Sequence, residues 1–125
     1  MARNRAGYYT AEDTVSAAFA FESGVTGTGS WSFVVAKGNE EDIIEIIGTK
    51  GKISFSSFQH GDVKLTTPQG EVSLSFQNPE NISHLLIQQV VNELRGECKC
   101  TSTGYSAART SKVLEEVVKE YYKNK

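Results

Sequence analysis

The strongest constraint on the fold is a change of hydrophobic period part-way along the chain. Apolar and polar residues alternate through most of residues 14–76, which is the pattern of half-buried β-strands. After residue 78 the apolar residues instead recur at helical spacing. Strands followed by helices predict an α+β fold: a mostly antiparallel open sheet of five to six strands, followed by two helices packed on one face.

Short connections join the predicted strands, and they imply mostly antiparallel neighbours. A Gly-bounded turn at Gly48–Gly51, for example, links two strand-like runs directly. The first of these runs, residues 43–47, is apolar on both sides apart from Glu45. A strand of this kind is typical of the middle of a sheet, so we expect residues 43–47 at a central position.

The helical part contains two segments with recognisable ends. Pro79 suits the first turn of a helix and Asn78 suits its cap, while Gly96 suits its C-terminal stop. A second helix is expected over about residues 106–122. The sequence shows no internal repeat and no linker, so residues 1–125 are predicted to form a single domain.

Composition excludes several classes of partner. The formal net charge is -2 and no Lys/Arg run occurs, which argues against nucleic-acid binding. No apolar run is long enough to span a membrane, and residues 1–5 lack the apolar segment of a secretory signal. Cys98 and Cys100 are separated by one residue, which suits a reduced protein better than a disulfide framework. These features predict a cytoplasmic protein.

One face of the predicted sheet has an unusual composition. On the first, second and fourth strands, the face opposite the core carries mainly Ser, Thr and Ala rather than Lys and Glu. Such a face is flat, nearly uncharged and cheap to desolvate, because hydroxyl groups can pair locally. We interpret it as a contact surface for another sheet or subunit. The alternative is a solvated face in which Ser and Thr serve β-propensity alone.

The chain offers no convincing catalytic, cofactor or metal motif. The glycines of residues 24–30 run directly into a strand rather than a helix, so they predict close backbone approach or a bulge in the sheet rather than a phosphate loop. His60 and His84 lack metal-ligand spacing with the cysteines. The acidic pairs within Glu12–Asp13 and Glu40–Asp42 are expected to be solvated. We therefore assign no catalytic, cofactor-binding or metal residue.

Several segments together resemble a known family. In order along the chain, they are Ala11–Ala17, Phe21–Val25, Gly27–Phe33, Glu45–Gly51 and Ser102–Thr110. Their order and spacing resemble the C-terminal domain of the Gfo/Idh/MocA oxidoreductases along nearly the whole chain. The resemblance implies an α+β domain with a large open sheet, preceded in full-length members by a Rossmann domain that binds NAD or NADP.

The resemblance also implies where chemistry would lie. Family members transfer hydride between the nicotinamide and a sugar, polyol or related carbon. The family's catalytic Glu-Lys-Pro lysine belongs to the Rossmann half, and its usual histidine precedes the segment corresponding to Tyr8, so neither motif occurs in this sequence. In the family the loop after the second strand lies near the substrate, which makes Lys37, Asn39 and Glu40 the substrate-proximal candidates. The family's sheet commonly mediates subunit contacts, which predicts a homo-oligomer.

Two hypotheses for function follow. The first is a fragment of an NAD(P)-dependent oxidoreductase acting on a sugar or polyol-like substrate, in which this chain is a platform for substrate-side contacts and oligomerisation. In that case the chain alone is inactive and binds no cofactor, and Met1 is an artificial start or a truncation point. The second hypothesis is an independent, non-enzymatic binding or scaffold module that has kept the sheet.

Overall fold

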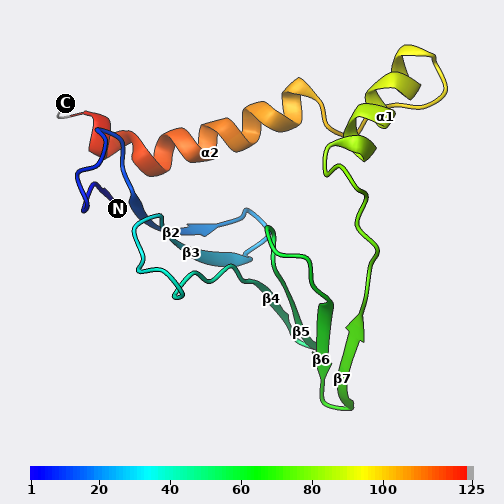
Figure 1. Ribbon diagram of the computed structural model, residues 1–125, viewed down its shortest axis with the longest axis horizontal. Coiled ribbons are helices and arrows are strands. Elements are labelled where there is room, and N and C mark those ends of the chain that lie inside the picture. Colours follow the sequence, from blue (N-terminus) through cyan, green and yellow to red (C-terminus); the bar gives the residue numbers. More distant parts are fainter. Residues whose placement is uncertain (124–125) are drawn as a thin grey trace. The chain divides into compact units, whose positions relative to one another are not determined.

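The computed structural model describes residues 1–123 and divides the chain into two compact units. The first unit contains Met1–Asn39 together with the chain from Thr101 onward, and the second contains Glu40–Cys100. Figure 1 shows the order of the elements along the chain.

The first unit is built on a three-stranded antiparallel sheet with the order β1-β2-β3. The strands are β1 (Ala2–Arg3), β2 (Thr14–Ala20) and β3 (Thr26–Ser32). The hairpin between β2 and β3 turns at Gly24, whose φ of 86° lies in the left-handed region that favours glycine. The long helix α2 (Gly104–Tyr122) completes the unit and contacts β1.

The glycines of β3 lie under aromatic rings. Gly27 is the Cα partner of Phe19 on β2, and a Cβ added at Gly27 would lie 2.6 Å from the Phe19 ring. A Cβ added at Gly29 would lie 2.2 Å from the ring of Trp31, two residues further along β3. The prediction of close approach within the sheet is therefore confirmed, since each glycine leaves the space that a ring occupies.

The second unit contains a four-stranded antiparallel sheet with the order β4-β5-β6-β7. Its elements are β4 (Ile44–Gly48), β5 (Gly51–Phe55), β6 (Val63–Thr67), β7 (Gly70–Leu74) and α1 (His84–Leu94). The β4–β5 turn is the Gly-bounded turn seen in the sequence, with Gly48 opposite Gly51. The central position expected for residues 43–47 is wrong, because β4 forms one edge of this sheet.

The α+β class and the antiparallel pairing are confirmed, but the single sheet of five to six strands is not. The strands instead form separate sheets of three and four strands, because the chain leaves the ladder after Ser32 and re-enters one only at Ile44. The intervening segment contains a turn and a polar stretch, Asn39–Asp42, rather than an alternating pattern. The two helices also differ in their packing: α2 contacts β1, whereas within residues 40–100 no strand packs closely against α1.

The helix ends follow local hydrogen bonding. The expected start of the first helix at Pro79 is wrong: α1 begins at His84, because the Asn81 side chain accepts the backbone N–H of Ser83 at 2.9 Å and forms the last turn before the helix. The expected stop at Gly96 is confirmed. Gly96 has φ 76°, and the N–H groups of Gly96 and Glu97 return to carbonyls of the last helical turn, as in a Schellman motif.

Candidate functional site

The candidate contact surface is one face of the first sheet, which we call the small-residue face. Its eight members alternate along the paired strands, and they are Thr14, Ser16, Ala18 and Ala20 on β2 and Thr26, Thr28, Ser30 and Ser32 on β3. Ser16 and Ser30 are Cα partners whose hydroxyl groups lie 3.3 Å apart. A shallow depression lies over this pair and its neighbours Ala18 and Thr28.

The small-residue face contains no charged side chain, and most of its members are exposed. Hydroxyl groups that pair with each other, as Ser16 and Ser30 do, lose little when water is removed from them. This is the composition that the sequence predicted for the first two long strands. The fourth predicted strand does not belong to the same surface: Ser54 lies in the other sheet, opposite Glu45 and Lys64.

A buried carboxylate fixes the segment beside this sheet. Asp13 is only 1% exposed, and its two oxygens accept the N–H groups of Arg5 at 2.9 Å and of Ala6 at 2.8 Å and the hydroxyl of Thr14 at 3.0 Å. Burial alone would raise the pKa of Asp13, but the hydrogen bonds from Ala6, Arg5 and Thr14 hold it below its usual value of 3.8. The expectation that Asp13 is solvated is therefore wrong.

Residues 4–13 form a loop that is held by the Asp13 carboxylate and by the Asn4 side chain. The Asn4 side chain donates to the carbonyls of Tyr9 and, at 2.7 Å, Ala11, and it accepts the N–H of Gly7 at 2.7 Å. The structure pairs β1 with β2 and folds the following residues into this loop.

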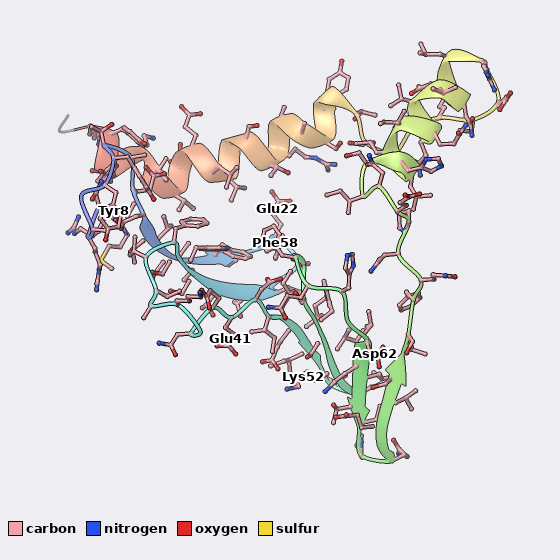
Figure 2. All side chains as sticks on the ribbon, viewed as in Figure 1. Tyr8, Glu22, Glu41, Lys52, Phe58 and Asp62 are labelled. Carbon is pink, nitrogen blue, oxygen red and sulfur yellow. The ribbon has the colours of Figure 1, made fainter. Side chains whose placement is uncertain are left out.

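The end of α2 is fastened to the same loop. The hydroxyl of Tyr121 donates to the carbonyl of Thr10 at 2.9 Å, and the hydroxyl of Tyr122 donates to Glu12 Oε2 at 2.6 Å. The Glu12 carboxylate raises the pKa of Tyr122, mainly through this hydrogen bond. Figure 2 shows Tyr8 in the same neighbourhood. No local sequence pattern signals these contacts, because they join residues separated by 110 positions or more.

The substrate-proximal candidates lie in the loop that follows β3. Asn39 N–H donates to the carbonyl of Ala36 at 3.0 Å, which makes a turn with Lys37 and Gly38 at its centre. Gly38 has φ 89°, so a glycine suits this turn. Lys37 and Asn39 thus lie on either side of Gly38 in one tight turn, and both are exposed. Glu40, also exposed, begins the second unit.

Further polar contacts lie in the second unit around Asp42. Its carboxylate accepts the Ser56 hydroxyl and, at 2.7 Å, the N–H of Phe58. These hydrogen bonds, first that of Ser56 and then that of Phe58, lower the pKa of Asp42. His60 is exposed and pairs with Asn78, since the Asn78 amide lies 2.6 Å from His60 Nδ1. These interactions order the loop that precedes β6.

The remaining chemistry-bearing residues do not converge. Cys98 is exposed, whereas Cys100 is buried and its thiol lies 3.9 Å from Gln89 Oε1. Within residues 1–123 no group of three or more His, Cys, Asp or Glu side chains is arranged to hold a metal ion. No described helix combines the length and the hydrophobicity that crossing a membrane requires. The residues taken forward as a candidate site are therefore those of the small-residue face and of the loop that follows β3.

These features define a class of protein: an α+β chain with two antiparallel sheets and two helices. In a comparison with family models, residues 1–54 match the GFO/IDH/MocA C-terminal domain. The match spans the first sheet, the loop with the substrate-proximal candidates, β4 and most of β5. The resemblance seen in the sequence is thus confirmed for part of this domain. Neither the curated proteins nor the solved structures gave a match.

Proposed function

We propose that this chain is part of a Gfo/Idh/MocA oxidoreductase and acts there as a platform rather than as the catalyst. The platform would hold subunits together through the small-residue face and would present the loop after β3 to a sugar or polyol-like substrate. NAD or NADP would be bound by a Rossmann domain outside these residues. The observation that carries the proposal is an uncharged sheet face within the region that matches the family domain.

The physical argument for subunit contact rests on desolvation. A charged side chain in an interface must lose its hydration, which costs several kcal/mol unless it is paired. The small-residue face has no charged group to desolvate: its polar side-chain atoms are hydroxyls, and those of Ser16 and Ser30 already pair with each other. Two flat sheet faces of small side chains can also approach closely, and a two-fold axis would pair the face with its own copy.

Sedimentation velocity tests the contact. Ser30→Glu places a charge at the centre of the small-residue face, so we expect it to halve the mass of the assembly and to weaken association at least tenfold. Ser54→Glu, on the charged face of the other sheet, is the matched control and should leave the mass unchanged. An assembly whose mass is the same in both variants would show that this face is not a subunit contact.

The substrate-side role is tested in the enzyme that contains these residues. Lys37, Asn39 and Glu40 carry donors and acceptors suited to the hydroxyl groups of a polyol. Lys37→Ala and Asn39→Ala should raise KM for the alcohol substrate while leaving KM for the dinucleotide unchanged. Lys50→Ala, in the turn after β4, serves as the control. Unchanged values of both constants in the loop variants would remove the loop from the substrate site.

A further inference from the structure

The sheet of the second unit has one face of uniform apolar chemistry, which we call the apolar sheet face. The register places Ile46, Ile53, Leu65 and Val72 side by side across all four strands. A second apolar row, two residues along each strand, runs from Ile44 to Leu74. The opposite face carries Glu45, Lys52, Lys64 and Glu71 among Ser and Thr residues, with Ile47 as its one aliphatic side chain. A face of this kind is built to be covered.

Nothing in its own unit covers the apolar sheet face. Ile46 is 56% exposed and Val72 is 53% exposed, although both lie in strands. Helix α1 also leaves apolar surface uncovered. One side of the helix carries a stripe of aliphatic residues, which we call the α1 stripe: Leu86, Ile87, Val90 and Leu94, the last of them 83% exposed. The stripe and the sheet face are therefore complementary surfaces that lack a partner within the described part of this unit.

Two hydrogen bonds hold the connection between these surfaces on an extended path. The Ser75 hydroxyl donates to Asp62 Oδ1 at 2.7 Å, and Asn78 donates to His60 Nδ1 at 2.6 Å. Both tie residues 75–78 to the loop before β6, so the chain continues past the end of β7. Figure 1 shows α1 at the far end of this extended segment, and Figure 2 marks Asp62 beside its start.

We propose that the apolar sheet face binds α1 from a second copy of this chain, so that two copies exchange their α1 helices. The lengths agree, since α1 has 11 residues and spans about 16 Å, while strands of five residues span about 17 Å. Exchange also lets each chain keep both hydrogen bonds of residues 75–78. A helix that folded back onto its own sheet would have to reverse within residues 79–83 or break them.

The area available matches what a stable dimer needs. Added over its residues, the exposed fractions of the apolar sheet face equal about 2.3 fully exposed aliphatic side chains, and those of the α1 stripe equal the same number. At about 100 Å² for one such side chain, each of the two surfaces offers roughly 230 Å² of apolar area. Two reciprocal contacts would bury about 900 Å² of apolar surface, which at the usual apolar fraction of about 60% implies roughly 1,500 Å² in total. Standard interfaces bury about 1,200–2,000 Å².

Charge complementation tests the exchange. The test uses the full chain in a Ser30→Glu background, so that the small-residue face cannot contribute and the two proposals fail separately. Leu65→Lys places a cation on the apolar sheet face, and Val90→Glu places an anion on the α1 stripe. Each variant alone should be a monomer, with dimerisation weakened at least 100-fold. Mixed in equal amounts, the two should form a heterodimer, since one contact is then unaltered and the other pairs Lys with Glu.

The controls and the refuting results are distinct. Val72→Lys, at an exposed edge strand, replaces Leu65→Lys if that variant does not fold, and Thr66→Lys on the opposite face should leave the dimer intact. A mixture that remains monomeric, or a Ser30→Glu parent that is monomeric at every concentration, would overturn the proposal in favour of α1 folding back on its own sheet. A Val90→Glu variant that still dimerises alone would also overturn it, because two sheets would then pack directly.

Discussion

Removal of the N-terminal cap of α2 tests how this helix is held. Thr103 Oγ1 accepts the N–H of Ser106 at 3.2 Å, and the Ser106 hydroxyl accepts the N–H of Thr103 at 3.0 Å, which completes a capping box. Thr103→Ala deletes the first of these hydrogen bonds. Loss of such a cap costs about 1 kcal/mol, within a range of about 0.5–2 kcal/mol.

The position of the cap determines which part of α2 opens when the Thr103 hydrogen bond is lost. The described contacts that fasten α2, through Tyr121 and Tyr122, lie at its opposite end, and no residue of α2 is fully buried. The first turns therefore depend on the cap rather than on packing, so a loss of about 1 kcal/mol should raise their open population about fivefold. For a unit of this size the midpoint of thermal unfolding should fall by about 4–8 °C.

Amide hydrogen exchange followed by mass spectrometry is the appropriate assay. In Thr103→Ala, peptides from the start of α2 should exchange about fivefold faster, while peptides that contain Tyr121 should change much less. Thr103→Asp, which keeps an acceptor at the cap position, should restore protection. Equal acceleration along the whole helix would refute the reasoning, because α2 would then be held as one packed element. Unchanged exchange would show that the cap contributes nothing.

Further predictions concern the loop, the sheet and the helix end. Folding lowers the pKa of Asp13, so the contribution of its carboxylate to stability should be complete above pH 3.8 and should be lost as the pH falls through the lower pKa of the folded state. Asp13→Asn should therefore lower the midpoint of thermal unfolding at pH 7 and remove this dependence on acid. Gly29→Val should displace the ring of Trp31 and shift its fluorescence to the red, a specific signal since the chain has one Trp. The Glu12 carboxylate raises the pKa of Tyr122, so in an ultraviolet titration Tyr122 should ionise at a higher pH in the unmodified protein than in the Glu12→Gln variant.

Features set by near neighbours in the sequence were predictable. The alternation of residues 14–76 identified the strands, and the glycines at 27 and 29 were placed correctly inside a sheet. The stop of α1 at Gly96 followed from local chemistry, and the helical spacing of apolar residues predicted that α2 runs to about Tyr122. Each of these features depends on contacts within a hairpin or a helical turn, which the order of residues encodes directly.

Features set by distant partners were not predictable in the same way. Asp13 looked like a solvated acid, because nothing local shows that the N–H groups of Arg5 and Ala6 point at it. The apolar character of β4 suggested a central strand, but the pattern reports only that both sides of a strand seek apolar neighbours. It does not say where the strand lies in the order of the sheet, and β4 lies at its edge.

The two proposed contact surfaces differ in what drives association. This difference predicts which of the two contacts is the stronger. The small-residue face offers little apolar area, so its contact gains mainly by avoiding the cost of desolvation. The apolar sheet face and the α1 stripe bury aliphatic side chains, and about 900 Å² at about 25 cal/mol/Å² gives roughly 22 kcal/mol before the costs of association and ordering. On dilution, contact through the small-residue face should therefore be lost first, and the exchanged dimer should persist. The opposite order would mean that α1 does not cover the apolar sheet face.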